Sequence, residues 1–107
     1  AILSRGRKLR LLDIATGLGL NLAAALKSGH VDAAVGLELS QAGVARALHN
    51  VRLNGLSGAS VLRFDACRPG EELWRLLGQR LGHIDARERH FDVVTMSFFS
   101  APPEGVT

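Results

Sequence analysis

Short apolar runs and amphipathic stretches alternate along this chain of 107 residues. Each apolar run ends near glycine or near a helix-capping residue, which is typical of strands buried in a parallel sheet. The stretches between the runs repeat apolar positions every three or four residues, which predicts helices with one buried face. The expected strands cover residues 9–15, 32–39, 59–66 and 91–99, and the expected helices cover residues 21–29, 41–56 and 69–81.

Local chemistry marks the ends of these helices. Ser40 is a good N-cap for the second helix, because its hydroxyl can accept a hydrogen bond from the first turn. Gly29 and the pair Asn54 and Gly55 are typical C-terminal stops. Two glutamates open the third helix, where the helix dipole favours negative charge. The boundaries are therefore supported by more than hydrophobic periodicity.

The order of the elements predicts the fold. Strand–helix–strand alternation with short connections requires a parallel sheet with right-handed crossovers. We therefore predict an α/β fold, a Rossmann-like doubly wound parallel sheet with the strand order 3-2-1-4 and helices on both faces. Met96, in the fourth strand, is expected to face the core. A complete domain of this kind has further strands, so we expect residues 1–107 to be a single domain cut from a longer chain.

Composition narrows the classes of function. Hydrophobic residues make up 47% and charged residues 21% of the chain, a globular profile without an apolar run long enough for a membrane span. Eleven arginines and two lysines give a net charge of +3, which either attracts nucleic acid or reflects genome composition. The single Cys67 excludes an internal disulfide and a zinc site of several thiolates. With a single cysteine, we expect a cytoplasmic protein. The four histidines lack metal-ligand spacing, so we expect no metal centre.

The residues that follow the strands carry the candidate chemistry. Ligands of such sheets bind at the carboxyl ends of the strands, where the strand order reverses. After the first strand, the segment from Asp13 to Asn21 has small residues at alternate positions: Ala15, Gly17 and Gly19. Small residues permit a sharp turn and let a ligand approach the main chain. In a glycine-rich chain this turn alone is a weak signal.

An acid follows each of the next two strands. Glu38 ends the second strand, where a carboxylate can accept hydrogen bonds from both hydroxyls of a ribose. Asp65 ends the third strand, where an acid can bind the exocyclic amine of an adenine beside the small Ala66. When each acid is considered alone, the simpler interpretation is a solvated acid at a strand end for Glu38 and a turn residue for Asp65. Together with the glycine turn, the two acids predict a nucleoside-bearing cofactor.

The spacing of the small residues and the two acids resembles that of the class I S-adenosylmethionine-dependent methyltransferases over residues 9–103. This resemblance implies S-adenosyl-L-methionine as the cofactor, with the methionine part near Asp13, the ribose at Glu38 and the adenine at Asp65. Ala15 stands where the family usually has glycine. The implied cofactor-binding residues are Asp13, Ala15, Gly17, Gly19, Asn21, Glu38, Asp65 and Ala66.

Half of an NAD-binding dehydrogenase is an alternative, although its third glycine would fall at Leu20. A further alternative is a non-catalytic fragment or pseudoenzyme that binds the cofactor weakly or only supports a partner.

The segment TGLGLN is also similar to the loop of the MnmC-like tRNA methyltransferases. That similarity implies an RNA partner, with the aminomethyl group of a wobble uridine in tRNA as the methyl acceptor. In that family the fourth strand ends in an Asp-x-Phe-Ser-Pro segment. Phe99 and Ser100 match its Phe-Ser pair, whereas Ser97 stands in place of its aspartate and Ala101 in place of its proline. The catalytic residue therefore stays open, with Ser97 as the one candidate.

Overall fold

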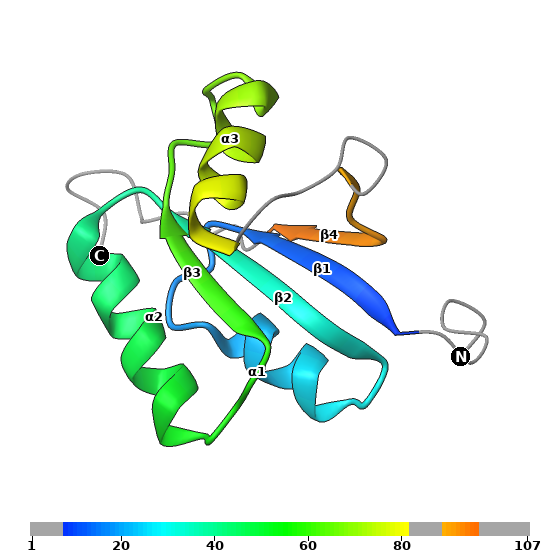
Figure 1. The fold of residues 1–107 in the computed structure, drawn as a ribbon. Helices are drawn as coiled ribbons and strands as arrows, with labels where there is room; N and C mark the ends of the chain where they lie inside the picture. The colour runs from blue at the N-terminus through cyan, green and yellow to red at the C-terminus, as the bar shows by residue number, and fades with distance from the viewer. Residues whose placement is uncertain (1–7, 82–88, 97–107) are drawn as a thin grey trace, which may run out of the picture.

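Three helices and four strands form the part of the chain that the computed structural model describes, residues 8–81 and 89–96 (Figure 1). The longest described helix has 13 residues, so none of the described helices is long and apolar enough to cross a membrane. In chain order the elements are β1 (Leu9–Ile14), α1 (Leu20–Lys27), β2 (Val31–Glu38), α2 (Gln41–Leu53), β3 (Ala59–Arg63), α3 (Gly70–Leu81) and β4 (Val93–Met96).

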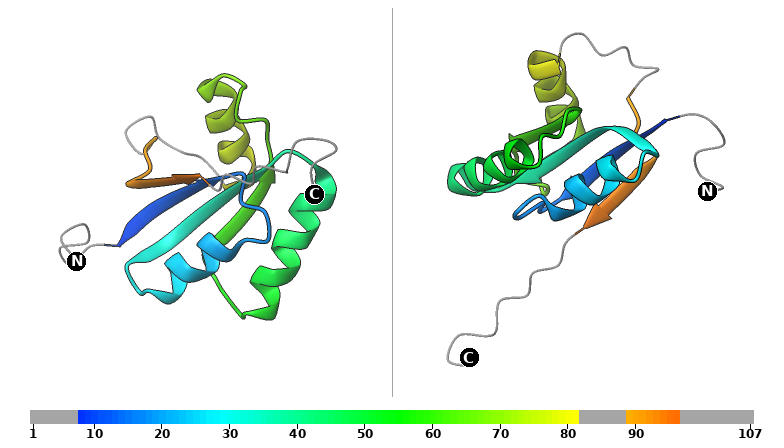
Figure 2. Two further views of the ribbon diagram at one scale, coloured as in Figure 1. Left: turned by 180° about the vertical axis from the view of Figure 1, so that it is seen from behind. Right: turned by 90° about the horizontal axis from the view of Figure 1, so that it is seen from below.

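The four strands form one parallel sheet in the order β3-β2-β1-β4, which confirms the predicted topology. The order in which strands are added to the sheet reverses between β1 and β4. The expected ligand-binding edge therefore lies at the carboxyl ends of these strands and their neighbours. Figure 1 shows α3 above the sheet and α1 and α2 below it, and Figure 2 shows the same layers from behind.

Side-chain alternation along the strands gives the sheet a core on each face. In β1, Leu11 joins the cluster beneath α1 and α2, whereas Leu12 joins the cluster beneath α3. Leu22 of α1 and Leu77 of α3 are the largest buried apolar side chains of the two layers. Because both faces of β1, β2 and β3 are covered, the carboxyl ends of these strands are held at fixed positions.

The predicted helix ends agree with the structure. The Ser40 hydroxyl accepts a hydrogen bond from the Gly43 N–H at 3.0 Å, as an N-cap does. Gly29 and Gly55 follow the ends of α1 and α2, and both adopt a left-handed conformation, which glycine tolerates best. The chain thus enters β2 and β3 through short connections of defined conformation.

Two predictions about the strands differ from the structure. The third strand was expected to extend to residue 66, but β3 ends at Arg63, and a turn built by Asp65 follows it. The prediction that Met96 faces the core was wrong, because its side chain is 51% exposed. Met96 lies on the α3 face of β4, and α3 packs over β1, β2 and β3, so no described element covers that side of β4.

Candidate functional site

The turn that follows β1 has an unusual backbone. Ala15, Gly17 and Gly19 all adopt positive φ angles, 58°, 58° and 80°. Glycine adopts such angles freely, whereas alanine pays about 1 kcal/mol or more in steric strain. The Thr16 N–H donates to the Leu37 carbonyl of β2 at 3.0 Å, which continues the sheet ladder into the turn. The alternation of small residues in the sequence therefore reflects a requirement of the backbone.

Asp13 holds this turn from beneath. Its side chain is fully buried, and one carboxylate oxygen accepts a hydrogen bond from the Thr16 hydroxyl at 2.7 Å. The other oxygen accepts from the Asn21 amide at 3.2 Å and from the Thr95 hydroxyl at 2.7 Å. One carboxylate thus joins the turn, the first turn of α1 and strand β4. Asp13 positions the turn, and it is not among the residues that line the two hollows described below.

Glu38 reaches the turn from the neighbouring strand. One of its carboxylate oxygens, Oε1, accepts a hydrogen bond from the Gly17 N–H at 2.7 Å. The other oxygen lies over Gly43 in the first turn of α2, and a Cβ at Gly43 would approach this oxygen to 2.5 Å. Glycine at position 43 is therefore required for the carboxylate to occupy its place. The side chain of Glu38 thus lies between the turn after β1 and the first turn of α2.

Helix α2 fixes the other side of the turn. The Asn50 amide donates to the Leu18 carbonyl at 2.9 Å. Gly19, which begins α1, lies against the backbone of Ala47, and a Cβ at Gly19 would lie 3.5 Å from the Ala47 carbonyl oxygen. The turn is thus held by β1, β2 and α2 together, so its small residues occupy fixed positions at the edge of the sheet.

Asp65 builds a turn and also lines a cavity. Its Oδ1 accepts a hydrogen bond from the Cys67 N–H at 2.9 Å, so the residue builds the turn between β3 and α3. It also lines a cavity together with Ala66. Nearby, Arg68 is paired with Glu72 by two hydrogen bonds of 2.9 and 3.0 Å. This pairing, with a smaller contribution from Asp65, raises the pKa of the Arg68 guanidinium.

Two hollows lie along this edge of the sheet. The turn hollow, about 530 Å³, is within the usual size range of ligand pockets. The strand-end hollow, about 160 Å³, lies across the carboxyl ends of β1, β2 and β3. Ala15 lines both, so the two hollows adjoin at that residue. The turn hollow is lined by Ala15, Thr16, Gly17, Leu18, Leu20, Asn21 and Arg46, and the strand-end hollow by Ile14, Ala15, Leu37, Leu39, Phe64, Asp65 and Ala66.

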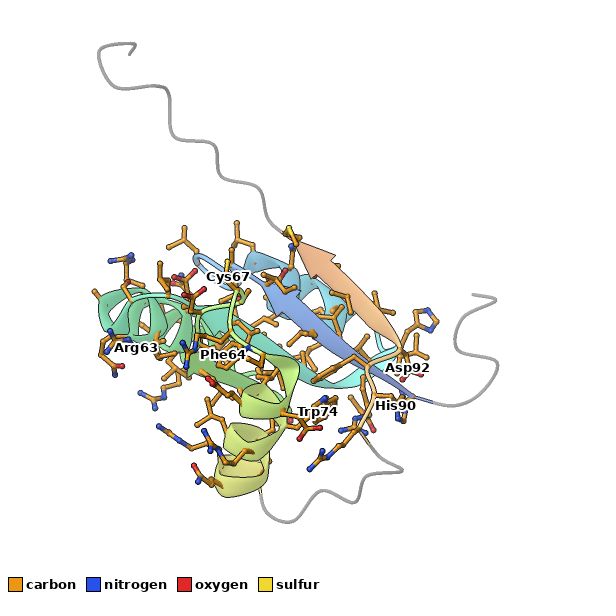
Figure 3. The ribbon with its side chains drawn as sticks, turned by 90° about the horizontal axis from the view of Figure 1, so that it is seen from above. Arg63, Phe64, Cys67, Trp74, His90 and Asp92 are labelled. Atoms are coloured by element: carbon orange, nitrogen blue, oxygen red, sulfur yellow. The ribbon has the colours of Figure 1, made fainter. Side chains whose placement is uncertain are left out.

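The structure therefore brings most of the predicted site residues together. Glu38 lines neither hollow, but it is bonded to Gly17 of the turn hollow and follows Leu37 of the strand-end hollow. Ser97, the candidate catalytic residue, lies outside the described residues. Asp92 lies at the amino end of β4, far from Cys67 at the opposite end of the sheet (Figure 3), and its carboxylate accepts the Arg10 N–H at 2.8 Å.

Sequence reasoning missed four residues that shape the site: Thr16, Gly43, Arg46 and Thr95. Gly43 is a small residue that follows Glu38 closely at the start of a helix, and this was a signal in the sequence. Only the fold shows that Gly43 faces the Glu38 carboxylate. Thr95 pairs with Asp13 through the register of β1 and β4, which the sequence does not specify. No group of three or more histidine, cysteine or acidic side chains within residues 8–81 and 89–96 could hold a metal ion.

Comparison with known proteins places the fold. No protein-family model matches the chain, and no curated protein sequence matches it significantly. Among solved structures, the [4+2]-cyclase SpnF is 28% identical, with a TM-score of 0.52 over 58% of this chain and 23% of its own. The ribosomal protein L11 methylase from Lactobacillus delbrueckii subsp. bulgaricus is 19% identical, with a TM-score of 0.51 over 79% of this chain and 50% of its own.

A S-adenosyl-L-methionine-dependent methyltransferase from Thiobacillus denitrificans, solved with S-adenosyl-L-homocysteine, is 25% identical, with a TM-score of 0.49 over 55% of this chain and 24% of its own. The first two superpositions establish the Rossmann-like fold that was predicted. The chain spans between about a quarter and half of the length of these solved proteins. Because a methylase and a cyclase share the fold, the fold alone does not define the reaction.

Proposed function

We propose that this chain binds S-adenosyl-L-methionine along the carboxyl edge of its sheet and serves as the cofactor-binding part of a methyltransferase. The observation that carries the proposal is the position of Glu38. Its carboxylate is bonded to the glycine turn at the corner between two adjoining hollows. A carboxylate has about four acceptor positions, so Glu38 can keep this bond and still accept both hydroxyls of a ribose.

The strand-end hollow fits an adenine ring. Leu37, Leu39 and Phe64 give it apolar walls, and Leu39 is 67% exposed, which is a cost unless a ligand covers it. Asp65 at its rim can accept hydrogen bonds from an exocyclic amine. Ala66 leaves space beside the ring plane. Flat apolar walls with one polar group for orientation are typical of nucleoside sites.

The remainder of the cofactor extends past Ala15 into the turn hollow. The sulfonium of the bound cofactor supplies an electrophilic methyl group, so the protein mainly needs to align the acceptor with it. The chain contributes a rigid turn for this purpose, because Asp13 and Glu38 fix it from two sides. Thr95 connects the same turn to β4, beside which the acceptor would lie.

An RNA acceptor, a tRNA wobble uridine in particular, is the finer form of the proposal. It is supported by the sequence TGLGLN and by the basic balance of the chain, +3 overall. The match to a cyclase favours a second candidate, in which the domain binds the cofactor but does not transfer its methyl group. Methylation of a tRNA transcript by the chain would separate the two.

Titration calorimetry with S-adenosyl-L-methionine, S-adenosyl-L-homocysteine and NAD tests the proposal. We expect both sulfur nucleosides to bind and NAD to bind at least tenfold more weakly, because Leu20 stands where the dinucleotide-binding pattern has its third glycine, which lets the helix pack closely on the strand. Heat from NAD alone, or no heat from any of the three ligands, would overturn the assignment.

A further inference from the structure

Among the described residues that line the turn hollow, Arg46 is the one that carries a charge. It lies in α2 and also lines a second, adjoining hollow with Leu18, His49 and Asn50. Neither hollow is lined by an aspartate or a glutamate, and helices α1 and α2 contain none. Arg46 thus has no acidic neighbour in these two helices or among the described residues that line the two hollows.

The other polar groups of the turn hollow are already engaged. The Thr16 hydroxyl and the Asn21 amide both donate to the buried Asp13. Arg46 makes no hydrogen bond or ion pair with another residue in the part of the chain that the structure describes. It therefore brings an uncommitted set of donors to a hollow whose apolar walls include Leu18 and Leu20, 50% and 69% exposed.

The position of Arg46 along the site decides what it can bind. The strand-end hollow, with Asp65, and the turn hollow, with Arg46, meet at Ala15. A ligand whose base lies beside Asp65 and whose ribose lies at Glu38 therefore extends toward Arg46. A planar guanidinium binds a carboxylate through two parallel hydrogen bonds, so an anionic tail is the matching group.

We propose that Arg46 binds the carboxylate of the amino-acid tail of the nucleoside ligand and so determines its specificity. This inference rests on the proposed function. The carboxylate of Glu38 is bonded to the Gly17 N–H of the same turn, between Asp65 and Arg46 along the proposed path of the ligand. Glu38 therefore excludes a second anion from the ribose position, and the carboxylate of the tail is directed to the Arg46 end.

The test compares S-adenosyl-L-homocysteine with 5′-methylthioadenosine, which keeps the adenine, ribose and sulfur but lacks the amino-acid tail. The chain without substitutions is expected to bind S-adenosyl-L-homocysteine about tenfold or more tightly than methylthioadenosine, as one charge-assisted contact allows. In Arg46→Gln this preference is expected to disappear, while the affinity for methylthioadenosine stays within about twofold. Arg46→Lys keeps the charge without the paired donors and is expected to restore part of the preference.

Arg52→Gln is the matched control, because it removes the same charge from the same helix and Arg52 lines neither hollow. It is expected to leave both affinities unchanged. The inference is overturned if Arg46→Gln weakens both nucleosides equally or neither of them. If the chain without substitutions binds neither nucleoside, the proposed function fails, and this inference fails with it.

Discussion

Glu38→Ala is expected to lower the affinity for S-adenosyl-L-homocysteine by about 1–3 kcal/mol, roughly a five- to 150-fold loss. The substitution removes the acceptor for the ribose hydroxyls and also the partner of the Gly17 N–H. The turn then loses one of its hydrogen bonds to β2 and keeps the bond from the Thr16 N–H to the Leu37 carbonyl. Titration calorimetry at equal salt and pH measures the loss.

Asp32→Ala provides the control for this substitution, because Asp32 is an exposed acid at the amino end of the same strand, β2. Its removal changes the net charge equally and is expected to leave the affinity within about twofold. An unchanged affinity in Glu38→Ala would show that the ribose does not lie at this carboxylate.

Gly43→Ala is expected to displace the Glu38 carboxylate without removing it. The added methyl group would lie 2.5 Å from Oε2 of Glu38, the far end of a flexible side chain, which must move. Alanine also favours the helix by up to about 1 kcal/mol, so the free energy of unfolding is expected to be maintained or raised. A fall in affinity without a fall in stability would identify Gly43 as a residue that positions Glu38.

Asp13→Ala is expected to lower the free energy of unfolding by about 3 kcal/mol, because three donors lose the acceptor that they share. The donors are Thr16, Asn21 and Thr95, of which Thr16 is only 3% exposed. Urea unfolding followed by far-ultraviolet circular dichroism measures the change, and S-adenosyl-L-homocysteine affinity is measured on the fraction that remains folded.

Thr95→Val and Thr95→Ser separate the parts of this network. Valine removes the hydroxyl that reaches Asp13 from β4 and is expected to cost about 1 kcal/mol, whereas serine keeps it and is expected to cost less. A loss below about 1 kcal/mol in Asp13→Ala would contradict the role of this carboxylate as the common acceptor.

Local sequence chemistry predicted what depends on neighbours in the chain. Ser40, Gly29 and the glycine turn are each defined by the backbone of a few adjacent residues, and the structure agrees with all of them. Contacts between distant segments were not predictable in the same way. The register of β1 and β4, which places Thr95 beside Asp13, could not be predicted from local sequence. The same is true of the orientation of α2, which places Arg46 at the turn hollow.

Two residues show how one pattern can hide a second role. Asp65 was expected either to bind a ligand or to build a turn, and the structure has it building the turn while lining the strand-end hollow. Asp13 was expected near the methionine part of the ligand, and the structure shows that it is buried beneath the turn, where its oxygens accept hydrogen bonds from other side chains. A sequence shows that an acid follows a strand, but burial decides whether its oxygens face a ligand or other side chains.

Backbone-amide NMR of the chain during titration with S-adenosyl-L-homocysteine tests most directly whether the carboxyl edge of the sheet holds an adenine nucleoside. The largest chemical-shift changes are predicted at Gly17 and Gly19 of the turn and at Leu39 and Ala66 of the strand-end hollow, with a common saturation curve. No saturable change, or changes confined to α3 and the amino ends of the strands, would contradict this binding site.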